Sequence, residues 1–163
     1  STGNKPIHVA EVNGARIACR NFSGEESQKN REGDRNFLLV LPDEDIADLF
    51  LNDTNEYGDS WNVHVKNDNP EDPWIYIPVK VKFNSMGPSI FLVTGGKRRR
   101  ITEKTVHMLD RITIANIDLD LTASDKIVNG KSYRTAYLRA MEITQSVNRF
   151  EERYADEEFD DED

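Results

Sequence analysis

Cysteine is almost absent from this sequence, which contains a single such residue, Cys19. One cysteine cannot form an internal disulfide, so a hydrophobic core has to hold the fold, and the composition suits a reducing compartment. Histidine is nearly as scarce, because His8, His64 and His107 lie in different segments without a cysteine or second histidine at metal-ligand spacing. We therefore expect no histidine-based metal site, and we expect Cys19 to be a small core residue.

Long hydrophobic runs are also missing. The longest uninterrupted apolar segment covers residues 37–41, whereas a membrane-spanning helix needs about 20 such residues. The first residues, STGNKPIHVA, show neither the basic region nor the apolar region of a signal peptide. These absences predict a cytoplasmic protein that has no membrane partner.

Motifs for catalysis are few. Gly95, Gly96 and Lys97 follow a predicted strand, but they lack the spacing of a phosphate-binding loop that ends in Gly-Lys-Ser/Thr. Asp118 and Asp120 share one face of a predicted strand and could bind a metal ion, although a solvated face or ion pairs with arginine are the favoured interpretation. We therefore expect a protein that is not an enzyme and that uses no cofactor.

The net charge of −9 is concentrated at one end of the chain. Residues 151–163 hold nine acids and one base, whereas residues 1–150 are almost neutral. This contrast predicts one folded domain over residues 1–150 and a disordered acidic tail over residues 151–163, with a helical turn at 147–154. A nearly neutral domain can still present a basic groove, because binding depends on where the charges lie.

The clearest structural pattern is a long hairpin between residues 114 and 144. Two periodic runs flank Asn129-Gly130, and both of these residues tolerate the positive φ of a tight turn. The predicted inward residues of the first arm are Ala115, Ile117, Leu119 and Leu121. In the second arm, one predicted face carries Tyr133, Tyr137, Arg139 and Met141, and the other carries Arg134, Ala136, Leu138 and Ala140. A hairpin is not stable alone in water, so other strands must complete a sheet.

Hydrophobic alternation predicts those other strands at residues 8–12, 14–22, 37–41, 61–66, 74–83 and 89–94. In the strand at 14–22, Cys19 is expected to face inward and Phe22 outward. Pro78 suggests that the strand at 74–83 is an edge strand or contains a bulge. Residues 23–36 form a predicted loop whose length is typical of functional or mobile loops.

Two short helices are predicted between the strands. Asp43 is a suitable N-cap for a helix whose buried face is Ile46, Leu49 and Phe50, and Thr102 is a suitable cap for a helix at 103–109. Together, these predicted elements give a β-rich α+β chain with five to seven strands and one or two short helices. A small closed barrel is the economical arrangement, because it buries one face of each strand and removes free edges.

Nucleic-acid binding has the most support among the residue patterns. Single strands are held by aromatic rings that stack on bases and by cations that follow the phosphates. Trp74, Tyr76, Lys80 and Lys82 share one face of the strand at 74–83 and provide this combination. An ordinary solvated strand face is an equally good interpretation of these four residues alone.

Other cations and aromatic residues extend the candidate set. The four consecutive cations at 97–100 form a predicted basic turn, and the preceding glycines would allow close approach to phosphate. The predicted hairpin adds further tyrosine and arginine residues, of which Tyr137 could equally belong to the core. The arginines of the 23–36 loop could close over a bound strand or simply lie on the surface. These additional candidates are Arg31, Arg35, Lys97, Arg98, Arg99, Arg100, Tyr133, Arg134, Tyr137 and Arg139.

Three segments resemble the single-stranded DNA-binding proteins encoded by tailed bacteriophages. They are NREGDRNFLLVL (30–41), LDRITIANIDLDL (109–121) and NGKSYRTAYLRAMEIT (129–144), and the resemblance covers most of residues 11–145. It implies an OB-fold barrel that coats single strands during phage replication or recombination without strong sequence preference. The acidic end is similar in kind to the partner-recruiting tails of bacterial single-strand binders, but Phe159 lies within the acids and no hydrophobic tip ends the chain.

Other functions remain open from the sequence. The net negative charge is compatible with a DNA mimic that inhibits a host protein. A barrel domain could also be a structural part of a virion. The tail could maintain solubility, compete with nucleic acid for a basic groove, or bind replication or recombination proteins, and composition does not choose between these roles. Homo-oligomer formation is equally open.

Overall fold

A computed structural model of the chain describes residues 9–68, 71, 74–85 and 87–146. The predicted helical turn at 147–154 and the predicted acidic tail at 151–163 lie outside the described residues. None of the helices in the described part of the chain is both long enough and apolar enough to cross a membrane.

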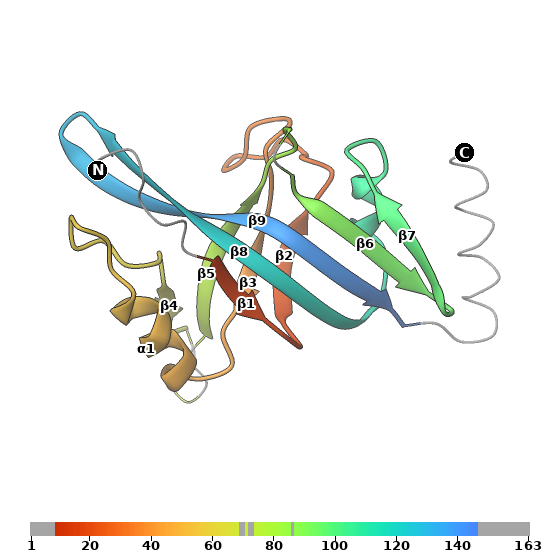
Figure 1. Cartoon of the computed structure of the whole chain (residues 1–163), viewed down its shortest axis with the longest axis horizontal. Coiled ribbons are helices and arrows are strands. Elements are labelled where there is room, and N and C mark those ends of the chain that lie inside the picture. Colours follow the sequence, from red (N-terminus) through yellow and green to blue (C-terminus); the bar gives the residue numbers. More distant parts are fainter. Residues whose placement is uncertain (1–8, 69–70, 72–73, 86, 147–163) are drawn as a thin grey trace.

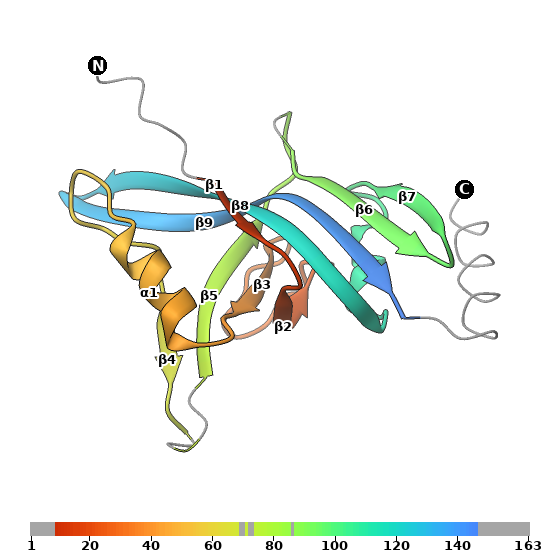
Figure 2. The same cartoon turned by 60° about the horizontal axis from the view of Figure 1, so that its bottom comes forward.

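The described chain forms one strongly curled sheet with a single α-helix beside it, as Figures 1 and 2 show. The main path of the sheet has the order β1-β8-β9-β5-β3-β2, while β4 pairs with β5 and the β6–β7 hairpin pairs with β9. This curled half-barrel confirms the predicted mostly β, OB-like fold. Its elements are β1 (Val9–Val12), β2 (Arg16–Asn21), β3 (Arg35–Val40), α1 (Glu44–Asn52), β4 (His64–Lys66), β5 (Trp74–Val81), β6 (Ser89–Thr94), β7 (Lys97–Ile101), a 3₁₀ helix η1 (Val106–Asp110), β8 (Ile114–Val128) and β9 (Lys131–Gln145).

The predicted hairpin is confirmed as the long antiparallel pair β8–β9. Its ladder closes at Val128 and Lys131, and the turn residues Asn129 and Gly130 have φ values of 52° and 80°. Positive φ at both turn positions gives the backbone twist that matches two right-twisted strands. The outer half of this hairpin projects beyond the rest of the sheet as an arm, which we define as residues 124–134 (Figures 1 and 2).

A β-bulge corrects the predicted faces of β9. Asp120 pairs with Ala140 but Leu121 pairs with Leu138, so Arg139 is an extra residue in its strand. The bulge reverses the alternation, and Met141 therefore lies in the core instead of sharing the outer face of Tyr137. A second register shift at the start of β8 leaves Ala115 exposed, against the prediction that it faces inward.

A register shift also overturns the predicted inward and outward faces of β2. The β2–β3 register shifts between Ala18 and Asn21, and Cys19 within this shift has a φ of 53°. As a result Cys19 is exposed, whereas Phe22 is completely buried and packs against Phe37 with ring centroids 5.5 Å apart. The expected core role of Cys19 was therefore wrong.

The helix α1 begins where the sequence predicts. The Asp43 carboxylate accepts a hydrogen bond from the Ile46 amide at 2.9 Å, which is the N-cap interaction. Ala47 and Phe50 are buried, but Leu49 is 67% exposed, so its predicted place in the helix core was wrong. The predicted helix after Thr102 is shorter than expected and forms the 3₁₀ helix η1.

Two strand predictions also change. The four cations at 97–100 do not form the turn, because Gly95 and Gly96 form it and the cations lie in β7 against β6. The strand at 74–83 is not an edge strand, since β5 pairs with β3 on one side and with β4 and β9 on the other. Pro78 lies between the segments that pair with β4 and with β9, where an interruption of the ladder is tolerated.

A buried ionic cluster fixes the arm to the segment after α1. The Arg134 side chain is fully buried, and its Nε and Nη2 donate to the Asp125 carboxylate at 2.8 and 3.2 Å. Its Nη1 donates to the Asp53 carbonyl oxygen at 2.9 Å, while Trp61 Nε1 donates to the Asp53 carboxylate at 2.8 Å. This cluster satisfies a buried charge and locks the direction of the arm.

We predict that Arg134→Met lowers the free energy of unfolding by about 3 kcal/mol or more, because Asp125 would be left without its partner in a buried site. Urea denaturation followed by circular dichroism measures this change. The matched control is Arg139→Met, which alters an exposed arginine of the same strand and should cost less than about 0.5 kcal/mol. Equal stability of the two variants would contradict the structural role of Arg134.

Candidate nucleic-acid interface

The outer face of β5 is the starting point of the candidate site. Ile75, Ile77, Val79 and Val81 are buried, so the alternating residues of the strand point away from the core. These outward residues are Trp74, Tyr76, Pro78 and Lys80, and Lys82 continues the row just after the strand. The predicted two faces of this segment are thus confirmed.

Aromatic rings form a continuous cluster at the start of this face. Tyr76 stacks on His64 with centroids 5.3 Å apart and an interplanar angle of 10°, and Trp74 lies 5.2 Å from Tyr76 at 47°. The ladder pairs His64 with Tyr76 and Lys66 with Trp74, so β4 adds an imidazole and a cation to the same face. His64 was absent from the candidate residues predicted from the sequence. The alternation at 61–66 nevertheless placed it on the strand face that does not carry Trp61.

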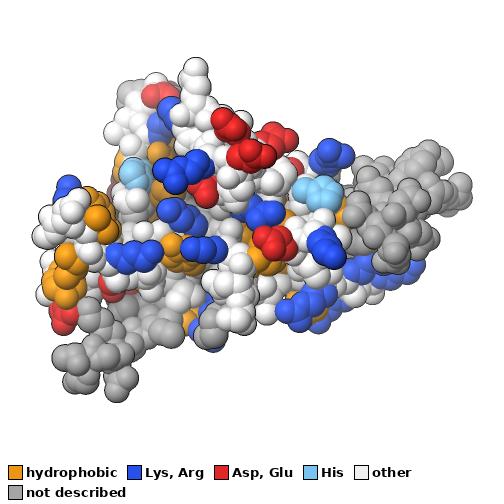
Figure 3. All heavy atoms as spheres, turned by 90° about the horizontal axis from the view of Figure 1, so that it is seen from above, with side chains coloured by type: hydrophobic (Ala, Val, Ile, Leu, Met, Phe, Trp, Pro, Cys, Tyr) orange, Lys and Arg blue, Asp and Glu red, His pale blue; other side chains and the backbone are white. Residues whose placement is uncertain are grey.

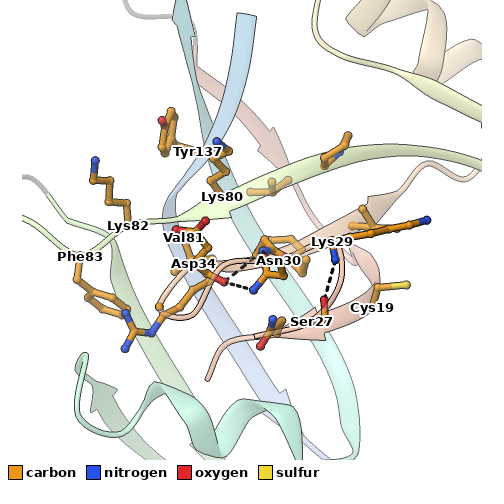
Figure 4. Close-up of a pocket in the computed structure, with 18 of the residues that line it drawn as sticks. Cys19, Ser27, Lys29, Asn30, Asp34, Lys80, Val81, Lys82, Phe83 and Tyr137 are labelled. Carbon is orange, nitrogen blue, oxygen red and sulfur yellow. Dashed lines mark hydrogen bonds between the residues drawn. The ribbon is translucent and has the colours of Figure 1, made fainter. Parts of the chain in front are cut away.

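A groove of about 900 Å³ continues this face. It lies between β5 and the loop of residues 23–34, as Figure 4 shows with Lys80, Lys82 and Tyr137 on one side and Lys29 on the other. Lys80 and Tyr137 are register partners of the β5–β9 pair, which places an amine beside an aromatic ring. Seen from above in Figure 3, lysine and arginine side chains gather over hydrophobic ones, with acidic side chains along one border.

The loop that forms the other wall of the groove is firmly braced. The Asn30 side-chain amide donates to the carbonyl oxygens of Glu25, Arg31 and Asp34 at 2.7 to 3.1 Å, and its oxygen accepts from Asn36 at 2.7 Å. At the start of the loop, the Asp110 carboxylate accepts from the Phe22 and Ser23 amides and from the Ser23 hydroxyl. These bonds brace the loop that forms this wall. Lys29, which the sequence patterns did not single out, also lines the groove.

Arg35 also lines the groove. Its Nη1 lies 3.3 Å from the Glu103 carboxylate, and its guanidinium lies 5.7 Å from the centroid of the Phe83 ring. The side chain is 20% exposed, and its Nε is buried without a hydrogen-bond partner among the described residues. Arg31 is exposed on the same loop but does not line the groove.

The β7 cations lie apart from this groove, at the other end of the sheet (Figure 1). Arg98 pairs with Glu142 at 3.2 Å and covers the Phe91 ring at 3.7 Å, in a depression that Asp118 and Asp120 also line. Among the β7 cations, Arg100 comes nearest to the groove. It lines a neighbouring depression, and Phe83 and Glu103 line both that depression and the groove. The partly buried Arg99 and the exposed Lys97 lie on the opposite side of the strand.

The four hairpin candidates lie in four different places. Tyr137 lines the groove, whereas Arg134 is enclosed in its ionic cluster and does not reach this surface. Tyr133 is 47% exposed on the arm, with Lys126 as its register partner and Lys131 Nζ 5.5 Å from its ring centroid. Arg139 is exposed at the bulge.

A family model described as "Putative phage ssDNA-binding domain" matches residues 2–163. The chain belongs to this family. Among the curated proteins, none matches the sequence.

Solved structures of a bacteriophage Enc34 protein share this fold. This family member is similar to the "Single-stranded DNA-binding protein from bacteriophage Enc34", with 13% identity and a TM-score of 0.52 over 87% of this chain and 83% of that chain. The same Enc34 protein in complex with single-stranded DNA gives 13% identity and a TM-score of 0.53 over 87% of this chain and 89% of that one. At this identity the likeness confirms the fold.

One residue of the acidic pair of β8, Asp118, has a structural contact in this member of the family. Asp118 Oδ1 accepts a hydrogen bond from the Gly14 amide at 2.9 Å and so fixes the β1–β2 turn. Within the described residues there is no group of three or more His, Cys, Asp or Glu side chains placed to hold a metal ion.

Proposed function

We propose that this phage single-stranded DNA-binding domain binds and protects single-stranded DNA with low sequence specificity and without catalysis. The observation that carries the proposal is the continuous outer surface of β5, where the His64–Tyr76–Trp74 cluster leads into a groove lined by Lys80, Lys82 and Tyr137. Bound strands would be replication or recombination intermediates in the cytoplasm of the host cell.

The two halves of this surface suit the two parts of a nucleotide chain. Trp74, Tyr76 and Tyr137 offer ring faces or edges to bases, and stacking of this kind tolerates any base. Lys80, Lys82 and the loop residue Lys29 offer cations to phosphates, and Arg35 offers another.

Low sequence specificity is supported by the polar groups of the groove. The amides of Asn30 and Asn36 are the side chains best suited to reading base edges, but both are used to brace the loop. Stacking and phosphate contacts therefore dominate the proposed binding. Lys97–Arg100 are assigned a secondary role, because Arg98 is already paired with Glu142.

The acidic end of the chain is a second point of proposed function. Residues 151–163 would recruit replication or recombination proteins or compete with DNA for the groove, and they lie outside the described residues. The alternative of an acidic inhibitor rests on this segment and on Asp118 and Asp120 of β8, since residues 1–150 as a whole are nearly neutral.

Titration of a labelled oligo-dT with the full chain, followed by fluorescence anisotropy at several salt concentrations, tests the function. We expect binding to the single strand to be much tighter than binding to duplex DNA of equal length. If four groove cations each neutralise one phosphate, the slope of log K against log salt is about −3. Absence of binding at low salt, with or without residues 151–163, would overturn the proposal.

Trp74→Ala tests the stacking cluster. We expect the variant to bind oligo-dT more weakly by about 1–3 kcal/mol, because one aromatic platform is lost. Trp74→Phe is the matched control and should retain most of the affinity, since it keeps an aromatic ring at the same place. Unchanged affinity of Trp74→Ala would remove this residue from the interface.

A further inference from the structure

Exposed apolar side chains concentrate at one end of this molecule. Among the described residues eight large hydrophobic side chains are exposed, and all except Val9 lie in α1, in β4 and the segment before it, or in the arm. Leu49 on α1 is 67% exposed, and Ile127 at the tip of the arm is 55% exposed. Apolar groups gathered in this way, at elements that no other described part of the chain covers, are typical of a protein–protein contact surface.

The two parts of this surface carry opposite charges. On α1, Asp45 lies four residues before Leu49 and Asp48 lies directly before it, and this spacing puts all three on the exposed helix face. On the arm, the exposed Lys126 and Lys131 share one face of the hairpin with Val128, which is 52% exposed, because Val128 pairs with Lys131 and lies two residues from Lys126. An apolar centre with an acidic border on one element thus matches an apolar centre with a basic border on the other.

We propose that this surface binds a second copy of the same chain, with the arm of each copy on α1 of its partner. Apolar contact between Val128 and Leu49 would form the centre of each contact, and the lysines of the arm would face Asp45 and Asp48. The tip and the exposed face of α1 complement each other in both polarity and charge, which makes a second copy a better occupant than an unrelated protein.

The position of the two patches determines the symmetry of the assembly. Both the arm and α1 lie at the same end of the molecule in the two views of Figures 1 and 2. When residue i of one copy contacts residue j of the other and the reverse contact also forms, the pair closes as a twofold dimer. The buried Arg134 cluster supports this arrangement, because it fixes the arm in one direction relative to α1. The β5 groove uses other residues, so this inference does not depend on DNA binding.

Sedimentation equilibrium of the full chain, without DNA and over a range of concentrations, tests the proposal. The expected result is a reversible association from 18.7 kDa to about twice that mass. Leu49→Asp and Val128→Asp should each weaken dimerisation by about tenfold or more, because each places a charge in an apolar contact. Val9→Asp is the matched control, since Val9 is exposed on β1 outside the surface, and it should leave association unchanged. Circular dichroism verifies that the variants are folded.

A charge exchange tests whether the two patches meet each other. Asp48→Lys and Lys131→Glu should each weaken the dimer, and the double variant should recover a large part of the lost affinity. A wild-type chain that stays monomeric at every concentration overturns the proposal, as does a dimer that survives both Leu49→Asp and Val128→Asp. Oligo-dT affinity measured at concentrations where the variants are monomeric is a separate readout, so loss of the dimer and loss of DNA binding are distinguishable.

Discussion

The structure depends first on the pairing of β5 along both of its edges. β3 binds one edge along most of the strand, and β4 and β9 share the other. This pairing buries Ile77 and Val79 completely, so the strand cannot turn about its axis without exposing core residues. The outer side chains of the strand are therefore held in fixed positions, and a nucleotide chain could bind them without the cost of ordering the backbone.

Two polar clusters extend this fixed arrangement to the elements around β5. Asn30 and Asp110 brace the loop that faces the strand across the groove, and Arg134 braces the arm beyond it. In each cluster the polar groups of an irregular segment are satisfied internally, which is the condition for keeping such a segment ordered near a core. The same clusters explain why several polar residues near the groove are not available for reading bases.

Local patterns in the sequence predicted the two features that matter most. The alternation at 74–83 identified the aromatic and basic face, and Asn129-Gly130 identified the hairpin turn, because both signals depend only on neighbouring residues. The bulges at Arg139 and Cys19 could not be predicted, since one extra residue reverses a face and leaves no local signal. The burial of Arg134 was equally hidden, because besides its hairpin partner Asp125 it requires Asp53, which lies 81 residues away.

Mapping of backbone amide shifts in an isotope-labelled sample, as a short oligo-dT is added, tests the central claim most directly. The account predicts that the largest changes occur at Trp74, Tyr76 and Lys80 and in the loop at 23–34, with small changes in β7. Large changes confined to β7 and β6, with β5 and the loop unaffected, would contradict it and would place the interface on the opposite end of the sheet.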